Sequence, residues 1–160
     1  MRRGVSRKKK NILLLLVGVC VIGNVVWGLN YLNYCKLTSE YIKCDKATFY
    51  KNDEDLTYFV KRPDYCSFTG SYTITNNNSI SVIIWPEVSF CKKYEIGVEF
   101  YDDVEKHIYR FYIDEQLNLV NTSENRFTFE QEETVKKMIA ENKEELQKMY
   151  QLAESEWKFS

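Results

Sequence analysis

The feature that most constrains this chain is an uncharged, apolar run over residues 12–32, which reads ILLLLVGVCVIGNVVWGLNYL. No charged residue lies between Lys10 and Lys36. At about 1.5 Å of rise per residue, a helix of this length crosses roughly 30 Å of hydrocarbon. The sequence therefore predicts a membrane-spanning helix over residues 11–33, with the remainder folding as a body held at the membrane surface.

The charges on either side of this run predict its orientation. Six basic residues lie within residues 1–10, whereas the segment just after the run carries only Lys36 and Lys43, partly offset by Glu40. Positive charge is retained on the cytoplasmic side of a membrane. We therefore expect a single-pass protein of the inner (cytoplasmic) membrane, with a cytoplasmic basic tail over residues 1–10 and a periplasmic or otherwise extracytoplasmic C-terminal domain.

A cleaved signal peptide is the alternative interpretation of the same run, because a basic start and an apolar core suit both. Cleavage normally needs small residues in an Ala-x-Ala-like pattern, and the first alanine of the chain is Ala47. The lack of such a site favours a retained anchor.

The side chain of Asn24 lies inside the predicted span, where an unpaired amide costs free energy. Two interpretations remain open: a contact with another membrane protein, or a hydrogen bond to the helix's own backbone. Beyond it, Trp27, Tyr31 and Tyr34 are expected at the outer headgroup layer, which amphipathic aromatic rings prefer.

Four of the five cysteines lie outside the span, and an even number in a small translocated domain indicates two disulfides. We prefer the pairing Cys35–Cys44 with Cys66–Cys91, although three connectivities are open. A zinc site is the alternative, but the chain has no C-x-x-C motif and one histidine, so we expect no metal.

The charge balance limits the partners. The 160-residue chain has a net charge of −1, and removing the six basic residues of the tail leaves −7 for everything after Lys10. An acidic domain argues against direct binding to nucleic acid. We expect no cofactor, and the expected partners are the membrane and another membrane or extracytoplasmic protein.

Beyond the span, the chain divides into a polar juxtamembrane segment over residues 34–55 and a domain over residues 56–160. Apolar and charged residues alternate clearly over residues 94–101 and 107–113, which is typical of half-buried strands. Turn-forming residues separate the strands at short intervals, so an antiparallel meander is predicted. The expected strands are 57–62, 71–75, 80–85, 94–101, 107–113 and 117–120.

The last segment has the pattern of a helix. Thr128 and Gln131 match a capping box, and apolar residues then recur at helical spacing as far as Trp157. The stripe consists of Val135, Met138, Ile139, Leu146, Met149, Tyr150, Ala153 and Trp157. The predicted fold class is α+β: an N-terminal transmembrane helix, then a small antiparallel β-meander with a C-terminal amphipathic helix packed on one face.

Candidate functional residues are few. His107 is the only histidine, and no nucleophile motif such as G-x-S-x-G accompanies it. It is a candidate pH sensor, because the unperturbed pKa of histidine is about 6.5, although an ordinary solvated histidine is the alternative. Tyr101, Tyr112 and Trp85 are expected on the sheet face away from the helix, as a binding surface for a protein or glycan or as half-buried packing.

The layout resembles the small single-pass periplasmic partners of ToxR-type membrane transcription regulators, of the ToxS, MyfF and PsaF sort. The matching features are the basic tail over residues 2–10, the span over residues 12–32, a compact β-rich domain and extracytoplasmic cysteines. The resemblance implies a protein that binds and stabilises the periplasmic part of a membrane-bound regulator, sometimes in response to pH. It carries no site residues to this chain.

The leading hypothesis is therefore a non-enzymatic, membrane-anchored interaction module that acts as an accessory to a regulatory complex. A second hypothesis is a periplasmic immunity protein, since an acidic domain suits a basic toxin. A third is an enzyme acting on envelope glycans through Glu95 and Glu99, which share a strand face on which neighbouring side chains are about 7 Å apart.

Overall fold

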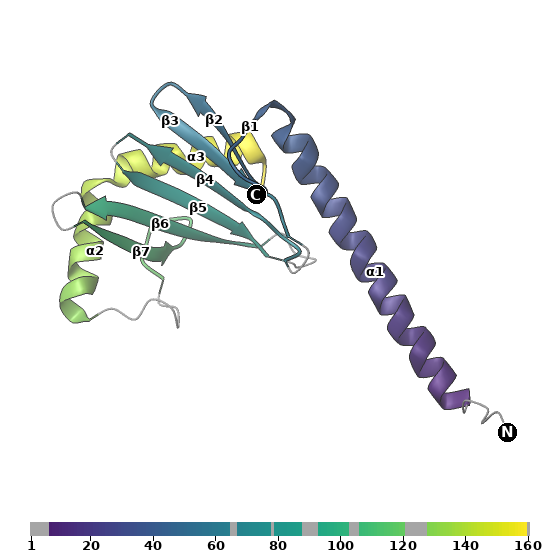
Figure 1. Ribbon diagram of the computed structural model, residues 1–160. Helices are drawn as coiled ribbons and strands as arrows, with labels where there is room; N and C mark the ends of the chain where they lie inside the picture. Colours follow the sequence, from purple (N-terminus) through teal and green to yellow (C-terminus); the bar gives the residue numbers. More distant parts are fainter. Residues whose placement is uncertain are drawn as a thin grey trace.

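The computed structural model describes residues 7–64, 67–77, 79–87, 93–102, 106–120 and 128–159. These residues form one long N-terminal helix, one antiparallel sheet and two C-terminal helices (Figure 1). The predicted α+β class is confirmed.

Helix α1 (Arg7–Leu37) projects from the rest of the molecule as a rod, with the N-terminus at its far end (Figure 1). The helix is long and apolar enough to span a membrane, and its most apolar segment is not buried inside the protein. Leu14 and Ile22, for example, are 69% and 66% exposed. Because water is a costly surrounding for so much apolar surface, α1 needs an apolar environment that the domain does not provide.

The seven strands form a single antiparallel sheet in chain order, so each strand pairs with its neighbour in the sequence. Their bounds are β1 (Ile42–Lys43), β2 (Thr48–Asp53), β3 (Leu56–Lys61), β4 (Ser71–Asn76), β5 (Ile80–Pro86), β6 (Tyr94–Asp102) and β7 (His107–Ile113). The predicted meander is confirmed.

One face of this sheet carries the hydrophobic core. A row of paired residues crosses five strands on that face: Tyr58, Ile74, Val82, Val98 and Phe111. All five side chains are buried. Because fully burying a large apolar side chain contributes roughly 1.5–3 kcal/mol, this face must be covered for the domain to fold.

Two helices, α2 (Phe129–Glu141) and α3 (Lys143–Trp157), cover that face (Figure 1). The predicted capping box is present: the Thr128 hydroxyl accepts a bond from the backbone N–H of Gln131, whose side chain accepts one from the backbone of Thr128. A single helix was expected, but Asn142 separates two, with φ −111° and ψ 17°. Its amide donates to the carbonyl of Met138 at 2.9 Å, and the apolar stripe continues beyond it on α3.

The main departure from prediction is the juxtamembrane segment over residues 34–55, which packs as part of the domain. Helix α1 continues to Leu37, a short 3-10 helix η1 (Thr38–Glu40) follows, and β1 and β2 then join the sheet. Phe49 is buried opposite Val60. At the other end, residues 117–120 form only an isolated bridge between Ile113 and Leu119 instead of the expected strand.

Candidate functional site

The C-terminal part of α1 is part of the hydrophobic core. Tyr34 is buried, with its ring stacked on Tyr72 at 5.4 Å between centroids. Tyr72 stacks in turn on Trp157 of α3 at 5.0 Å, and Trp157 meets the edge of Tyr58 at 5.9 Å. Four rings from α1, β3, β4 and α3 thus form one continuous cluster. Tyr34 was expected at the headgroup layer, but the fold buries it inside the domain.

The loop between β3 and β4 fastens α1 from the side. The indole N–H of Trp27 donates to the carbonyl of Asp64 at 2.6 Å. The side-chain amide of Asn30 donates to the carbonyl of Phe68 at 3.0 Å. The backbone N–H of Gly70 donates to the Tyr34 hydroxyl at 3.1 Å. A Cβ atom at Gly70 would lie 1.8 Å from the carbonyl oxygen of Lys61, so the close approach requires glycine here.

The end of α1 is held by an arginine. Arg62 donates from Nε to the hydroxyl of Thr38 at 2.9 Å, and that hydroxyl donates to the Tyr34 carbonyl at 2.8 Å. The guanidinium lies 3.8 Å from the ring centroid of Phe49, within cation–π range. Thr38 is buried, so these bonds satisfy polar groups that water does not reach.

The end of α3 is fastened to the same region. The indole N–H of Trp157 donates to the Tyr41 hydroxyl at 3.2 Å, and Tyr41 donates to Glu156 at 2.9 Å. Lys51 of β2 pairs with the same carboxylate at 3.1 Å. Burial, together with the neighbouring Glu156 carboxylate, raises the pKa of the Tyr41 hydroxyl above its ordinary value, so this tyrosine stays a donor over the whole physiological range.

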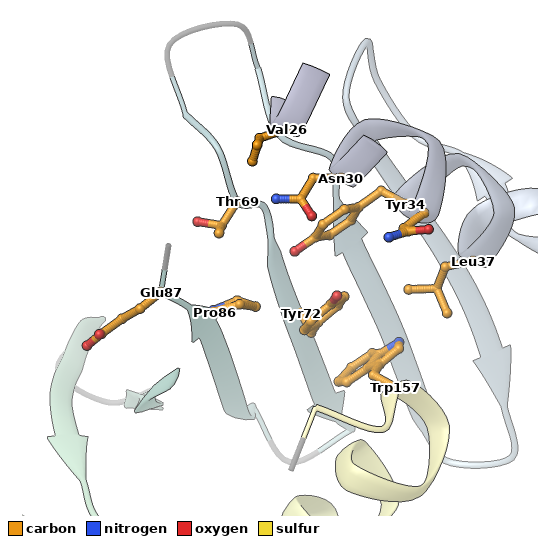
Figure 2. Close-up of a pocket in the computed structure, with 10 residues that line it drawn as sticks. Val26, Asn30, Tyr34, Leu37, Thr69, Tyr72, Pro86, Glu87 and Trp157 are labelled. Atoms are coloured by element: carbon orange, nitrogen blue, oxygen red, sulfur yellow. The ribbon is translucent and has the colours of Figure 1, made fainter. Parts of the chain in front are cut away.

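A cavity of about 550 Å³ lies between α1 and the sheet, next to this cluster (Figure 2). We call it the junction pocket. Figure 2 shows Val26, Asn30 and Tyr34 of α1 on one side, with Thr69, Pro86 and Tyr72 on the other. Glu87 stands at the rim with its carboxylate turned away from the rings. The lining consists of Val26, Asn30, Asn33, Tyr34, Leu37, Thr69, Tyr72, Pro86, Glu87 and Trp157.

The opposite face of the sheet, here called the outer face, carries the three aromatic residues predicted for a binding surface. Trp85 lies across Gly97, where an added Cβ atom would come within 2.4 Å of the indole ring, and its ring centroid is 5.5 Å from that of Tyr112. Trp85 and Tyr112 are half-buried, whereas Tyr101 is 42% exposed. Ile108, which pairs with Tyr101 and was not predicted, is 51% exposed.

The carboxylates proposed for catalysis also lie on the outer face, but they are not neighbours. Glu99 pairs with Arg110 at 2.5 Å, while Glu95 is exposed opposite Trp85. Residues four apart on a strand are separated by about 13 Å, since each adds about 3.3 Å. The expected spacing of about 7 Å applies to residues two apart and was wrong for this pair. Paired carboxylates in glycosidases are about 5–9.5 Å apart.

Two further predicted residues can be placed. The Asn24 amide donates to the carbonyl of Cys20 at 2.8 Å, which is the bond to the helix's own backbone that the sequence left open. Contact of Asn24 with a membrane partner stays a prediction. His107 is exposed at the start of β7, with its ring 4.7 Å from that of Tyr109, and its role as a pH sensor also stays a prediction.

The preferred cysteine pairing is not formed where the structure describes it. Cys35 and Cys44 are both free thiols. Cys35 lies on the last turns of α1, whereas Cys44 lies beyond β1, where its backbone N–H closes the β1–β2 turn by donating to Thr48 at 2.9 Å. Cys66 and Cys91 lie outside the described residues. Within the described ranges no group of three histidine, cysteine or acidic side chains could hold a metal ion.

Sequence reasoning missed the joint between α1 and the domain. Trp27, Tyr31, Tyr34 and Thr38 recur at intervals of four, three and four residues, which places them on one side of a helix. That spacing continues past the expected end of the span, and it could have indicated a helix that enters the domain.

The chain matches no protein-family model, no curated protein and no solved structure. Its class is therefore defined by its own architecture. It is an α+β protein in which one helix, long and apolar enough to span a membrane, continues into the core of a seven-stranded antiparallel meander.

Proposed function

We propose that this protein is a membrane-anchored, extracytoplasmic binding module, the accessory and stabilising partner of a membrane-bound regulatory protein. It sits in the inner membrane with its N-terminus in the cytoplasm, and its domain acts by binding rather than by catalysis.

The observation that carries this proposal is the joint between α1 and the domain. The exposed apolar part of α1 continues without a break to Tyr34 in the core. Hydrogen bonds from Trp27 and Asn30 also fasten it to the loop between β3 and β4. A flexible tether would leave the domain free to rotate. A continuous, packed helix holds it in one orientation close to the membrane, as docking onto a second membrane protein requires.

The outer face supports a binding role. Both C-terminal helices lie on the other face of the sheet, and no described element covers the outer one (Figure 1). Tyr101 and Ile108 form an exposed apolar pair there, with Trp85 and Tyr112 farther across the same face. Aromatic residues are enriched in the centres of protein interfaces, so we assign the partner contact to this face.

A reporter that is active only outside the cytosol tests the orientation. Fused after Ser160, it is expected to be active, and the same reporter fused within the first ten residues is expected to be inactive. Activity in the opposite pair of fusions, or a mature N-terminus near residue 28, would overturn the anchor.

Site-specific photocrosslinking in native membranes tests the partner surface. A photoreactive residue at Tyr101 or Ile108 is expected to give one adduct with an integral membrane protein, and the same group at Glu141 of α2 is expected to give none. The variant Asn24→Leu distinguishes a contact through the outer face from a contact through the membrane span. Loss of the adduct in that variant would place recognition in the span. Equal labelling from α2 and the outer face would contradict the proposal.

A further inference from the structure

We propose that the junction pocket binds one phospholipid whose zwitterionic headgroup carries an ammonium group. The proposal rests on the membrane anchoring put forward above and adds a ligand site to it. It follows from the position of the pocket, its size and the chemistry of its lining.

The position of the pocket connects the bilayer to the domain. Val26 lies inside the predicted span and Leu37 beyond it, so the α1 wall extends over about 16 Å of helix axis at about 1.5 Å per residue. Val25 and Leu29, next to that wall, are 55% and 59% exposed on the surface that lipid would cover. A lipid can therefore enter along α1 with its acyl end at Val26 and its headgroup toward the domain.

The size of the pocket suits the headgroup region of one lipid, with its acyl chains continuing past Val26 into the bilayer, rather than a partner helix. A helix about 10 Å across occupies roughly 420 Å³ per turn of 5.4 Å. The 550 Å³ of the pocket would accept little more than one such turn. The same volume falls within the range of about 300–1,000 Å³ that small-molecule sites have.

The lining suits a lipid with an apolar and a polar part. Tyr72, Trp157 and Pro86 offer apolar and aromatic surface for the uncharged part of the lipid. Asn33 and Thr69 offer neutral groups that can donate to phosphate oxygens. Asn33 is exposed on α1, and Thr69 is half-buried in the segment before β4.

The charge of the lining favours a zwitterion over an anionic lipid. Among the described residues of the lining, Glu87 is the only charged one, and its carboxylate lies at the rim. An ammonium group can therefore pair with Glu87, whereas a lipid with net negative charge meets that carboxylate without an ammonium to offset it.

Retention of lipid by the full-length chain tests the proposal. The protein is reconstituted into vesicles of equal parts phosphatidylethanolamine and phosphatidylglycerol and then solubilised in detergent. Native mass spectrometry measures the mass of the protein with any lipid it retains. The wild type is expected to retain one phosphatidylethanolamine. Asn33→Trp fills the pocket from an exposed helix position and is expected to lose it. Leu32→Trp, one residue away at a position outside the lining, is the matched control and is expected to keep it.

A charge reversal tests the headgroup. Glu87→Lys is expected to lower the retention of phosphatidylethanolamine roughly tenfold, equivalent to about 1.4 kcal/mol, while Glu141→Lys on α2 makes the same charge change without effect. Equal retention of phosphatidylglycerol, retention by Asn33→Trp, or a copurified polypeptide in place of lipid would overturn the proposal. Flotation of the vesicles separates the two proposals. If the protein floats with the vesicles but retains no lipid, only the lipid site in the junction pocket is overturned. If the protein does not float, the membrane anchoring is overturned as well.

Discussion

At the scale of single residues, two close contacts determine how the chain packs. Gly70 lets the chain after β3 pass against Tyr34, and Gly97 lets Trp85 lie flat on the outer face. Neither glycine has a positive φ, so the requirement at both is space rather than backbone freedom. Each explains a feature that alternation of residue types alone does not predict.

Gly97→Ala is expected to destabilise the full-length protein by about 1–3 kcal/mol, because the added methyl group overlaps the Trp85 ring and the packed site must shift. Urea unfolding in detergent, followed by tryptophan fluorescence, measures the change. In a Trp85→Ala background the same substitution is expected to cost less than about 0.5 kcal/mol, since the clash is gone and alanine is favoured over glycine in a strand. Equal costs in the two backgrounds would show that the Trp85–Gly97 contact does not matter.

At the scale of elements, the helices are fixed by their ends. The N-terminus of α2 is closed by a reciprocal capping box, and α3 ends at Trp157, beside the end of α1. The break at Asn142 lets the two helices follow the core face in different directions (Figure 1).

Thr128→Ala is expected to lower the free energy of unfolding by about 1 kcal/mol, because the backbone N–H of Gln131 loses its acceptor. Thr128→Ser keeps the hydroxyl and is expected to stay within about 0.3 kcal/mol of the wild type. Thermal unfolding by circular dichroism compares the two variants. If serine and alanine behaved alike, the cap would contribute nothing to stability.

Tyr34→Ala is expected to cost about 3–5 kcal/mol, the range for removing a buried aromatic side chain, and to release the end of α1 from the domain. Limited proteolysis of the full-length protein should then cut between α1 and β1. Leu32→Ala, at an exposed position two residues earlier, is the control and should leave the cleavage pattern unchanged. An unchanged pattern for Tyr34→Ala would mean that the joint does not depend on the aromatic cluster.

At the scale of the whole molecule, buried tyrosines link stability to alkaline pH. Burial raises the pKa of Tyr72, and its neighbour Tyr34 adds to the effect. Burial also raises the pKa of Tyr94, supported by its hydrogen bonds with Tyr150 and Glu115, both at 2.8 Å. These hydroxyls join separate parts of the core, so their ionisation acts on the domain as a unit.

The pKa values of Tyr72 and Tyr94 in the folded state lie above about 10, which is the value for tyrosine in the unfolded chain. The contribution of these two protonated hydroxyls to stability is therefore complete below about pH 10 and decreases as pH rises beyond it. We expect the domain to unfold cooperatively above that pH, with a late group of tyrosines ionising in the same step. Absorbance at 295 nm, recorded together with circular dichroism, checks this coincidence. Tyr94→Phe should move the transition to higher pH, and a shift to lower pH would contradict the assignment.

The sequence by itself determined the exposed apolar helix, the meander and the amphipathic C-terminal segment. Each follows from a local periodicity or a run of one residue type, and the Thr128 cap was predicted for the same reason. Only the tertiary structure decided that α1 continues to Tyr34 in the core, that residues 42–53 extend the sheet and that a pocket separates α1 from β4 and β5. These features depend on contacts such as Tyr34 with Tyr72 and Tyr72 with Trp157, between residues tens of positions apart, and no local pattern encodes which distant surfaces meet.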